Sequence, residues 1–368
     1  MNILLVITGL GMGGAERLVT SLADYYAGAD HRVLLVYLTG DMVVSPRHQG
    51  VEISYLALNS IFNFPGAYIK LRRIIRNFKP DVVHSHMVHA NLISRLVRLT
   101  CKFQRLVCTA HSTDEGGRLR MLSYRVTDFL ADISTNVSVA AVNSFIEKGA
   151  ASAGRMIPVP NGIDTSQFTF SSEARERIRK SLGISEEQKL ILSVGRLEPQ
   201  KDYPNFLSAL ALLKNIRGDF VVCIVGDGRL RSDLESSIEA LGLNGVVRLL
   251  GIRRDISEIM CAADVYVLSS ACEGFGLVVA EAMACQRVVV ATDCGGVGEV
   301  VGDAGILVPV RNHELLSRAL QKALSLDLPS RERLSRSARQ RIVQMYSFET
   351  AASRYLELYK TDSNGAAL

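Results

Sequence analysis

Four segments of the sequence carry residue types that could bind phosphate and sugar. The first, ITGLGMGGAER, begins at Ile7 and places Gly9, Gly11 and Gly14 in a G-x-G-x-x-G pattern. Such glycines let a phosphate approach the backbone at the start of a helix, where free N–H groups and the helix dipole favour anions. The loop is predicted to bind a phosphate or a carboxylate, and a tight turn without a ligand is the alternative.

The same glycine pattern occurs in dinucleotide-binding loops. A nicotinamide cofactor would also need an acid at the end of the second strand, to bind the ribose hydroxyls. The candidate strand RVLLVYL ends in Leu38 and Thr39, and Asp41 comes only after Gly40. The sequence therefore favours a different phosphate-bearing ligand, and an NAD-dependent oxidoreductase stays as the alternative function.

The segment SSACEGFGLVVAEAMAC holds two carboxylates near the start of a predicted helix. Glu273 precedes the helix, and Glu281 lies in a stretch that is otherwise apolar on every side, where an unpaired carboxylate is costly. Glu281 therefore needs a hydroxyl or a cation as its partner. The segment is predicted to offer both carboxylates to sugar hydroxyls and the N–H groups of Phe275, Gly276 and Leu277 to a phosphate. A capping Glu and a buried ion pair are the alternative.

Two cations follow the predicted strand KLILSVG in the segment SVGRLEPQKDY. Arg196 can bind a pyrophosphate bidentately, and Lys201 can act on it as a point charge. We expect both side chains at the carboxyl end of a strand, where open parallel sheets bind ligands. Pairing with surface carboxylates is the competing interpretation.

Histidines end two predicted strands of the first half, in PDVVHSHMVHA and VCTAHSTDEGG. His84 and His86 share one face of a strand, but no carboxylate or cysteine stands beside them, so a metal site is not expected there. His111 closes its strand and opens a glycine-rich loop, which makes it either a ligand-site residue or a structural one. The sequence contains no D-x-D motif. The carboxylates of such a motif usually bind the divalent ion that contacts a nucleotide diphosphate.

These residues stand at the ends of apolar, β-branched runs that alternate with helical patterns. Runs such as ILLVIT and RVLLVYL predict strands covered on both faces of a parallel sheet, and the pattern restarts with KLILSVG after VPNGIDTSQFTF. The 368 residues are therefore predicted to form an α/β protein with two doubly wound, Rossmann-like domains facing a cleft, residues 1–168 and 169–345. The amphipathic C-terminal helices, from Arg331 to about Lys360, need an apolar surface to cover.

The formal net charge is +5, but the segment from Ala67 to Arg125 alone carries +9, with twelve Lys or Arg and three acids. Each basic residue near an anionic leaflet adds about 1 kcal/mol, so this segment predicts contact with anionic lipid or a phosphate-bearing substrate. A solvated helix face is the alternative. Nucleic acid is not expected, because there is no binding module and little aromatic interleaving.

No stretch reaches the roughly 18 apolar residues of a membrane-spanning helix. The N-terminal MNILLVITGL lacks a basic leader and a cleavage site, so it predicts a buried strand and not a signal peptide. The seven cysteines are odd in number and show no C-x-x-C spacing, which is typical of reduced thiols. We therefore expect a cytoplasmic protein.

Seven motifs, taken in order, resemble those of the retaining glycosyltransferases of family GT4, which have the GT-B fold. They are GMGGAERL, PDVVHSH, TAHS, VPNGID, SVGRLEPQKD, IVGDG and EGFGLVVAEAMAC, the last with an E-x7-E from Glu273 to Glu281. The resemblance covers nearly the whole chain. It implies that the first domain holds the acceptor and the second the nucleotide sugar, with a helix at about residues 346–362 crossing back to the first domain.

The resemblance also implies roles for individual residues. Glu273 would hold hydroxyls of the donor sugar, and Glu281 the nucleotide ribose. Arg196 and Lys201 would neutralise the diphosphate and stabilise the leaving nucleotide in place of a metal ion. His111 would approach the sugar near its reacting carbon. Gly13 and Gly14 would lie against the diphosphate or the acceptor, and the remaining positions that the resemblance assigns to the donor are Asn161, Gly226, Phe275, Gly276 and Leu277.

Members of this family transfer a sugar from a nucleotide diphosphate with retention of the anomeric configuration. Many relatives of this size build bacterial surface polysaccharide, such as O-antigen or capsule, on a polyprenyl-diphosphate carrier at the cytoplasmic face of the inner membrane. The resemblance thus implies a UDP- or GDP-linked donor, a glycan or polyprenyl-diphosphate-linked acceptor, peripheral contact with an anionic membrane surface, and no cofactor or metal. The alternatives are an NAD-dependent oxidoreductase and a non-catalytic nucleotide-sugar-binding protein.

Overall fold

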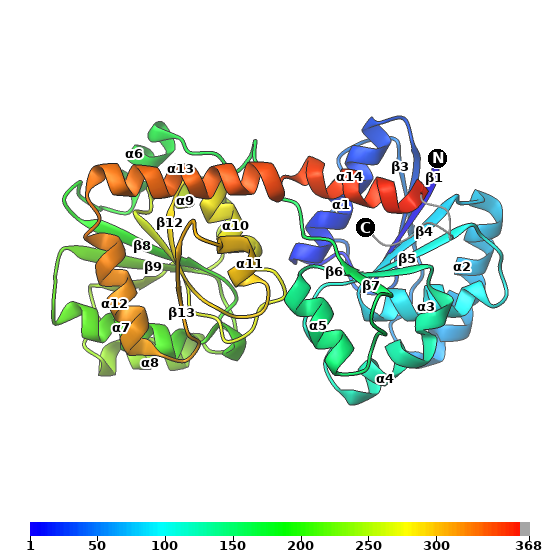
Figure 1. Cartoon of the computed structure of the whole chain (residues 1–368), viewed down its shortest axis with the longest axis horizontal. Coiled ribbons are helices and arrows are strands. Elements are labelled where there is room, and N and C mark those ends of the chain that lie inside the picture. The colour runs from blue at the N-terminus through cyan, green and yellow to red at the C-terminus, as the bar shows by residue number, and fades with distance from the viewer. Residues whose placement is uncertain (361–368) are drawn as a thin grey trace. The chain divides into compact units, whose positions relative to one another are not determined.

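The computed structural model describes residues 1–360, which form two compact units. Unit 1 comprises Met1–Gly162 together with the chain from Glu349 onward, and unit 2 comprises Ile163–Phe348. Each unit contains one parallel sheet with helices on both of its faces (Figure 1). The predicted α/β class with two Rossmann-like sheets is confirmed.

The sheet of unit 1 has seven parallel strands in the order β3-β2-β1-β4-β5-β6-β7. The strands are β1 (Asn2–Ile7), β2 (Arg32–Tyr37), β3 (Val51–Tyr55), β4 (Val82–His86), β5 (Arg105–Ala110), β6 (Ile133–Asn136) and β7 (Met156–Pro158). The helices are α1 (Gly14–Gly28), α2 (Phe64–Phe78), α3 (Val88–Arg98), α4 (Arg118–Thr127), α5 (Val139–Glu147) and α14 (Phe348–Lys360), with 3-10 turns η1 (Ile61–Asn63) and η2 (Asp128–Leu130).

Helices cover both faces of this sheet, which accounts for its continuously apolar strands. On one face, Leu4 of β1 belongs to a buried cluster that includes Leu71 of α2. On the other face, α1 and α14 pack together (Figure 1): the Tyr26 hydroxyl donates to the Ala352 carbonyl at 3.2 Å, and the rings of Tyr26 and Tyr359 lie 5.7 Å apart. The last helix of the chain is therefore part of unit 1.

The sheet of unit 2 has six parallel strands in the order β10-β9-β8-β11-β12-β13. The strands are β8 (Lys189–Val194), β9 (Phe220–Val225), β10 (Val247–Leu249), β11 (Val265–Leu268), β12 (Val288–Thr292) and β13 (Ile306–Val308). The helices are α6 (Ser172–Ser181), α7 (Tyr203–Lys214), α8 (Arg231–Ala240), α9 (Ile256–Ala262), α10 (Leu277–Ala284), α11 (Val297–Val301), α12 (His313–Leu324) and α13 (Leu328–Met345), with the 3-10 turn η3 (Pro199–Lys201).

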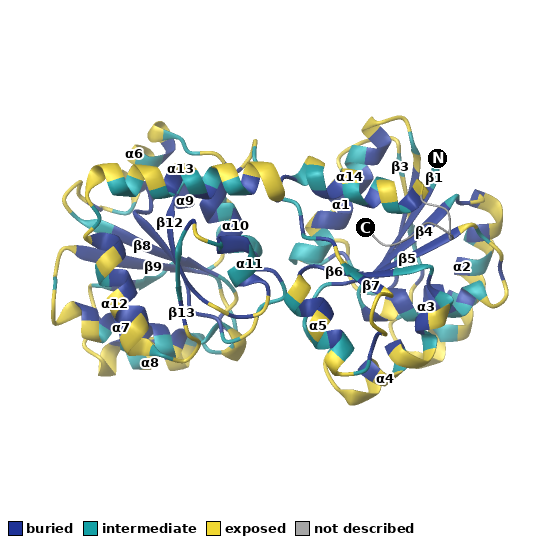
Figure 2. Ribbon diagram, in the orientation of Figure 1, coloured by how far each residue is buried: buried dark blue, intermediate teal, exposed yellow. Residues whose placement is uncertain are grey.

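The strands of unit 2 are buried, and exposed residues lie on the outer faces of its helices (Figure 2). A buried carboxylate fastens α6 to this sheet. Asp264, beside β11, accepts hydrogen bonds from Arg175 at 2.7 Å, from Arg179 at 3.2 Å and from the Leu190 backbone N–H at 2.8 Å. Charge pairing inside the fold is thus a feature of this unit.

The chain enters unit 2 at Ile163, where it is hydrogen-bonded to the end of α13. The Ile163 N–H donates to the Tyr346 carbonyl at 2.9 Å, and the Phe348 N–H donates to the Ile163 carbonyl at 2.9 Å. The boundary predicted from the sequence, after residue 168, lies six residues later than the boundary after Gly162 that the contacts give. The helix expected at about residues 346–362 corresponds to α14, and residues 361 and 362 lie outside the described residues.

Both sheets reverse their strand order at the same point of the topology. Chain order runs outward in one direction from β1 and in the other from β4, and likewise from β8 and from β11. Ligands of open parallel sheets bind beyond the carboxyl ends of the strands at such a switch point. The loops after β1, β4, β8 and β11 are therefore the places to look for a site.

Candidate functional site

The switch point of unit 2 carries the two predicted cations. Arg196 follows β8 and is exposed, with no ion pair to any of the described residues. Lys201 ends the turn η3, and its Nζ lies 2.5 Å from Oε1 of Glu273, in the loop after β11. The structure therefore brings Lys201 and Glu273 together from the two strands that flank the switch.

Hydroxyl groups hold this pair in place. The Ser270 hydroxyl donates to Oε1 of Glu273 at 2.7 Å, and the Thr292 hydroxyl donates to the Ser270 carbonyl at 2.6 Å. The Ser269 hydroxyl donates to the Lys201 carbonyl at 2.8 Å. The side chains of Lys201 and Glu273 are about 15% exposed or less, so the pair is largely shielded from solvent but not fully buried.

Two glycines allow the loops of unit 2 to pack backbone against backbone. A Cβ atom on Gly226 would lie 2.0 Å from the Gly195 carbonyl oxygen, and one on Gly295 would lie 1.7 Å from the Glu273 carbonyl oxygen. Both glycines also have positive φ angles, which side chains disfavour. Gly226, assigned to the donor by resemblance, thus supports the loop that carries Arg196. Sequence reasoning missed Gly295, which supports Glu273 in the same way.

The helix α10 begins beside these loops. Gly276 caps its N-terminus with a φ of 88°. Phe275 is buried, with its ring 5.6 Å from that of Tyr346, so only its backbone can face a ligand. Leu277, the first residue of α10, is half-buried. The three predicted N–H groups therefore open one helix, as expected for an anion site.

Glu281 is half-buried on α10, and its charge acts on the same tyrosine as that of Glu273. Burial is the main cause that raises the pKa of Tyr266 well above its usual value, and the charges of Glu281 and Glu273 add to it. The Tyr266 hydroxyl donates to the Val194 carbonyl at the end of β8 at 3.4 Å. Both carboxylates of the E-x7-E motif therefore lie around one buried tyrosine at the switch point.

The switch point of unit 1 carries histidines in place of cations. His86 ends β4, His111 follows β5, and the His86 Nδ1 lies 3.1 Å from the His111 Nε2. Burial lowers the pKa of His111 to about 4, so its ring is neutral at physiological pH. In the described part of the chain, no group of three or more His, Cys, Asp or Glu side chains is arranged to hold a metal ion.

The glycine loop after β1 contains an acid that sequence reasoning did not single out. Gly13 is the N-cap of α1, and a Cβ atom on it would lie 2.2 Å from Oε2 of Glu16. A glutamate three residues after an N-cap occupies the capping-box position, which is the signal that could have identified it. Gly14 is the first residue of α1. A phosphate at this loop would have to displace the Glu16 carboxylate.

The last predicted residue, Asn161, lies next to the end of unit 1. It is buried, and its Oδ1 has no hydrogen-bond partner among the described residues. None of the seven cysteines forms a disulfide; six of them are buried, whereas Cys272 is exposed beside Glu273. No helix in residues 1–360 is both long and apolar enough to cross a bilayer.

Comparison with known proteins covers both units. Residues 12–167 match the family described as Glycosyltransferase Family 4, and residues 174–341 match Glycosyl transferases group 1. The D-inositol 3-phosphate glycosyltransferase of Corynebacterium urealyticum is 32% identical over 307 residues, which cover 76% of this chain and 71% of the relative. The chain belongs to glycosyltransferase family 4. The catalytic class of this glycosyltransferase is thereby established.

Two further comparisons place this glycosyltransferase among proteins of known fold and named substrates. It is 26% identical over 308 residues to the UDP-Gal:alpha-D-GlcNAc-diphosphoundecaprenol alpha-1,3-galactosyltransferase of Escherichia coli, covering 79% of this chain and 78% of the relative. The crystal structure of Anabaena HepE in complex with UDP and glucose superposes with a TM-score of 0.83 at 22% identity, covering 97% of this chain and 98% of that chain. The predicted GT-B fold is therefore confirmed.

Proposed function

We propose that this glycosyltransferase transfers a sugar from a nucleoside-diphosphate sugar, without a metal ion and with retention of the anomeric configuration. The observation that carries the proposal is the Lys201–Glu273 pair at the switch point of unit 2, with the free Arg196 on the adjoining loop and the N-terminus of α10 beside it. Cations, N–H groups and a hydroxyl-binding carboxylate meet there, and a sugar diphosphate needs all three.

Charge neutralisation of the leaving diphosphate is the proposed work of unit 2. Lys201 and Arg196 would bind its oxygens, and the N–H groups of Phe275, Gly276 and Leu277 would add the helix dipole. Lys201 would exchange part of its contact with Glu273 for phosphate, which leaves that carboxylate free to accept hydroxyls of the sugar. Glu281 would bind the nucleotide ribose.

Unit 1 is proposed to supply uncharged groups. The neutral ring of His111 would hydrogen-bond an oxygen of the donor sugar, because a ring with a pKa of about 4 cannot act as a cation at pH 7. Gly13 and Gly14 would approach the diphosphate or the acceptor, with Glu16 turned away. Asn161 has an unsatisfied Oδ1 that can accept one hydroxyl.

A UDP-linked donor and a lipid-linked acceptor are the proposed substrates. The UDP complex of Anabaena HepE and the diphosphoundecaprenol substrate in the name of the Escherichia coli relative support this choice. The surface of α4 in unit 1 also supports it. Four exposed apolar side chains lie at helical spacing on α4 and its continuation η2, namely Leu119, Leu122, Val126 and Phe129.

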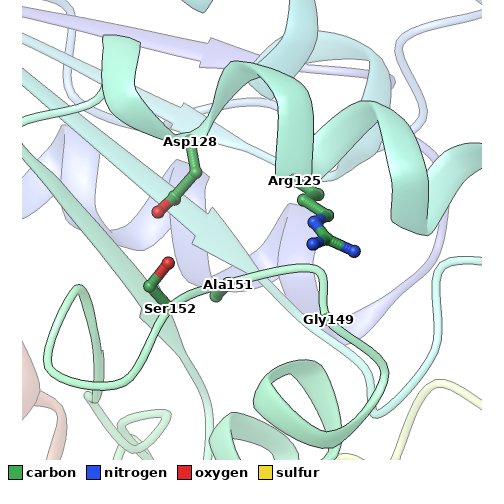
Figure 3. A pocket seen from close by; sticks show the side chains of 5 residues that line it. All are labelled: Arg125, Asp128, Gly149, Ala151 and Ser152. Carbon is green, nitrogen blue, oxygen red and sulfur yellow. The ribbon is translucent and has the colours of Figure 1, made fainter.

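Basic side chains flank this α4 surface, and the ten residues of α4 include no acid. Arg118 and Arg125 make no ion pair to any described residue, and they line a cavity of about 470 Å³ with Lys148. Arg125 and Asp128 line a second cavity of about 190 Å³ (Figure 3). Apolar groups between free arginines suit an anionic lipid bilayer, which we propose as the partner of this surface.

Thermal shift with UDP, GDP and their sugars tests the donor site. A ligand at 100 times its dissociation constant stabilises the fold by about 2.7 kcal/mol. We expect one nucleotide to raise the melting temperature, and Glu281→Ala to abolish the shift. Stabilisation by NADH that survives Glu281→Ala would favour an oxidoreductase. Binding without transfer or hydrolysis of the donor would indicate a sensor, and loss of turnover with EDTA would contradict a metal-independent reaction.

Co-sedimentation with phosphatidylcholine vesicles, with and without phosphatidylglycerol, tests the membrane partner. We expect binding only to the anionic vesicles, lost on Leu119→Ser with Phe129→Ser. The matched control changes two exposed isoleucines of unit 2, Ile216→Ser with Ile252→Ser, and should bind as the wild type does. Wild-type protein that stays unbound at low salt would overturn this part of the proposal.

A further inference from the structure

Two buried thiols lie in contact between α9 and the end of α10 in unit 2. Cys261 is on α9, and Cys285 is the C-cap of α10. Their Sγ atoms lie 3.1 Å and 3.9 Å from the same Ser257 carbonyl oxygen, and the two side chains also hydrogen-bond to each other. Neither cysteine forms a disulfide, and both are 2% exposed or less. The two helices therefore hold a pair of reduced thiols together.

A buried guanidinium lies against this thiol pair. Arg287 donates from Nε to the Cys285 carbonyl at 2.9 Å and from Nη1 to the Cys261 carbonyl at 3.2 Å. It also packs over the ring of Phe170, 4.6 Å from the ring centroid. Arg287 is 9% exposed and makes no ion pair with any described residue. A buried cation without a carboxylate partner stabilises a negative charge that forms beside it.

These neighbours favour a thiolate on one of the two cysteines. The pKa of Cys261 is lowered to about 6, chiefly because the Cys285 thiol donates a hydrogen bond to its sulfur. The Ser171 N–H and the Arg287 guanidinium lower this pKa further, whereas burial and the charge of Glu258 oppose the shift. The same hydrogen bond raises the pKa of Cys285. Cys261 is thus the nucleophilic sulfur, with a second thiol beside it that can resolve an oxidised form.

Single buried thiols of the same unit show the opposite trend. Burial raises the pKa of Cys223 to about 11 and that of Cys294 to about 12. Burial alone therefore keeps a thiol of this unit protonated and unreactive. Cys261 differs from these two thiols because Cys285 and Arg287 lie beside it, which makes Cys223 and Cys294 suitable internal controls.

Cys285 also lies one turn after Glu281, the residue proposed to bind the nucleotide ribose. The Cys285 N–H donates to the Glu281 carbonyl at 3.0 Å, and the charge of Glu281 contributes to the raised pKa of Cys285. The sulfur atoms of a disulfide are about 2.05 Å apart, closer than two thiols in hydrogen-bond contact. A bond between Cys261 and Cys285 would therefore draw the last turn of α10, which carries Glu281, towards α9.

We propose that Cys261 and Cys285 are a redox-modification site, which a hydroperoxide such as hydrogen peroxide converts to a disulfide. The Cys261 thiolate attacks one peroxide oxygen, the O–O bond breaks and hydroxide leaves, which gives a sulfenic acid. Cys285 then attacks the Cys261 sulfur, the S–O bond breaks, and the proton of Cys285 leaves with that oxygen as water. Exchange with a cellular thiol reduces the disulfide again. The disulfide does not depend on the proposed function, whereas its effect through Glu281 rests on it.

Peptide mapping of the full chain tests for the disulfide. The Cys272→Ser variant serves as the parent protein, because it lacks the exposed thiol that could cross-link two molecules. After hydrogen peroxide, alkylation in denaturant and proteolysis, we expect a Cys261–Cys285 disulfide that dithiothreitol removes, with Cys223 and Cys294 recovered as alkylated thiols. Alkylated Cys261 and Cys285, or oxidation of Cys261 to sulfinic acid without a disulfide, overturns the proposal.

Single variants in this parent protein test which sulfur reacts first. We expect Cys285→Ser to accumulate a sulfenic acid on Cys261, which dimedone traps, because the resolving thiol is missing. Cys261→Ser is the matched control, and its Cys285 should stay unlabelled. Equal labelling of the two variants overturns the assigned order of reaction, and the peptide map of the parent protein decides the disulfide even if neither variant folds.

Nucleotide affinity measures the effect through Glu281. We expect the oxidised parent protein to bind UDP about fivefold or more weakly than the reduced protein, as for typical coupling between two sites, and to recover with dithiothreitol. The same protein with Cys285→Ser should bind UDP equally before and after peroxide. Equal affinity of the oxidised and reduced parent protein overturns the effect through Glu281. If the reduced protein binds no UDP, the proposed donor and this effect fail together, and the peptide map still decides the disulfide.

Discussion

The two units have the same strand order at the switch point but place opposite chemistry there. In unit 2, Lys201 and Glu273 form an ion pair beside the exposed Arg196. In unit 1, the corresponding edge carries glycines and the neutral ring of His111. The comparison shows that topology determines where a ligand binds, whereas the loop side chains determine what part of it each unit can hold.

One acid of each unit provides a second comparison. Asp264 in unit 2 is bonded by two arginines, but Glu115 in unit 1 has only the Tyr124 hydroxyl, at 3.5 Å, as its side-chain hydrogen-bond partner among the described residues. Unit 1 also contains a paired buried acid, because Asp128 is bonded by Arg95 at 3.4 Å and by Arg155 at 3.0 Å. The contrast in pairing is therefore one between Asp264 and Glu115. Four changes can break or sharpen the comparison of the two units.

The largest expected effect comes from Lys201→Ala. Removing one cation from a diphosphate site costs about 2.7–4 kcal/mol of transition-state stabilisation, so we expect kcat to fall by about 10² to 10³. His111→Ala removes a neutral hydrogen bond worth about 0.5–1.5 kcal/mol, so its kcat should fall by only about 3- to 12-fold. Steady-state kinetics on both variants tests the ranking, which a stronger effect of His111→Ala would reverse.

Gly295→Ala should have the next largest effect. The new Cβ would lie 1.7 Å from the Glu273 carbonyl oxygen, so the loop must move and donor KM should rise by about tenfold or more. Gly183 also has a positive φ, 61°, but nothing lies within 4 Å of a Cβ there. Gly183→Ala therefore introduces the strain of a positive φ without a steric clash, and serves as the control. Equal kinetic constants for the two variants would show that the clash with the Glu273 carbonyl does not affect donor binding.

Gly13→Ala tests the glycine loop of unit 1. Its backbone is extended, and the new Cβ meets only the flexible end of Glu16, so thermal stability should change little. We expect turnover to fall by about tenfold if the diphosphate or acceptor approaches this loop. Gly28→Ala, which meets nothing within 4 Å, is the matched control. Unchanged turnover would restrict the phosphate site to unit 2.

The smallest effect concerns Glu115 and pH. Burial raises its pKa from 4.5 to about 7, so the folded state binds a proton that the unfolded state lacks between those values. The free energy of unfolding should therefore decrease as pH rises from about 4.5 to 7. Glu115→Gln should flatten that slope in urea titrations across this range, and an unchanged slope would count against a buried neutral carboxyl.

Asp264 should show the opposite dependence. Burial raises its pKa, but Arg175, the Leu190 N–H and Arg179 outweigh that cause and lower it below 3.8 in total. Its contribution is present above the unfolded pKa and is lost as pH falls below it. The same urea titrations therefore distinguish Asp264 from Glu115 by the sign of the slope.

The sequence predicted the fold more fully than the site. Continuous apolar runs such as KLILSV and FVVCIV identify parallel strands, because a strand covered on both faces needs apolar residues at every position. The loops with Arg196, Lys201 and Glu273 were placed correctly at strand ends, because the end of an apolar run is also visible in adjacent residues. The unit boundary was placed too late, because the hydrogen bonds of Ile163 to Tyr346 join segments far apart in the chain.

Individual roles depended on such distant contacts. Gly226 is assigned to the donor by the family resemblance alone, and only the structure shows that it packs against Gly195. His86 looks like one of several strand-end histidines, and only the fold places it within hydrogen-bond distance of His111. The contact of Gly226 with Gly195 and that of His86 with His111 cannot be predicted from residues adjacent in the sequence.

The sequence by itself determined that this chain has two parallel sheets, which loops carry charge and which carry glycine, and the family to which the motifs belong. Those properties follow from the local periodicity of apolar residues and from the types of residue in each motif. The tertiary structure alone decided which cation pairs with Glu273, which glycines support the loops, and that His86 lies beside His111. Such contacts arise when strands far apart in the chain become neighbours, and no local pattern records them.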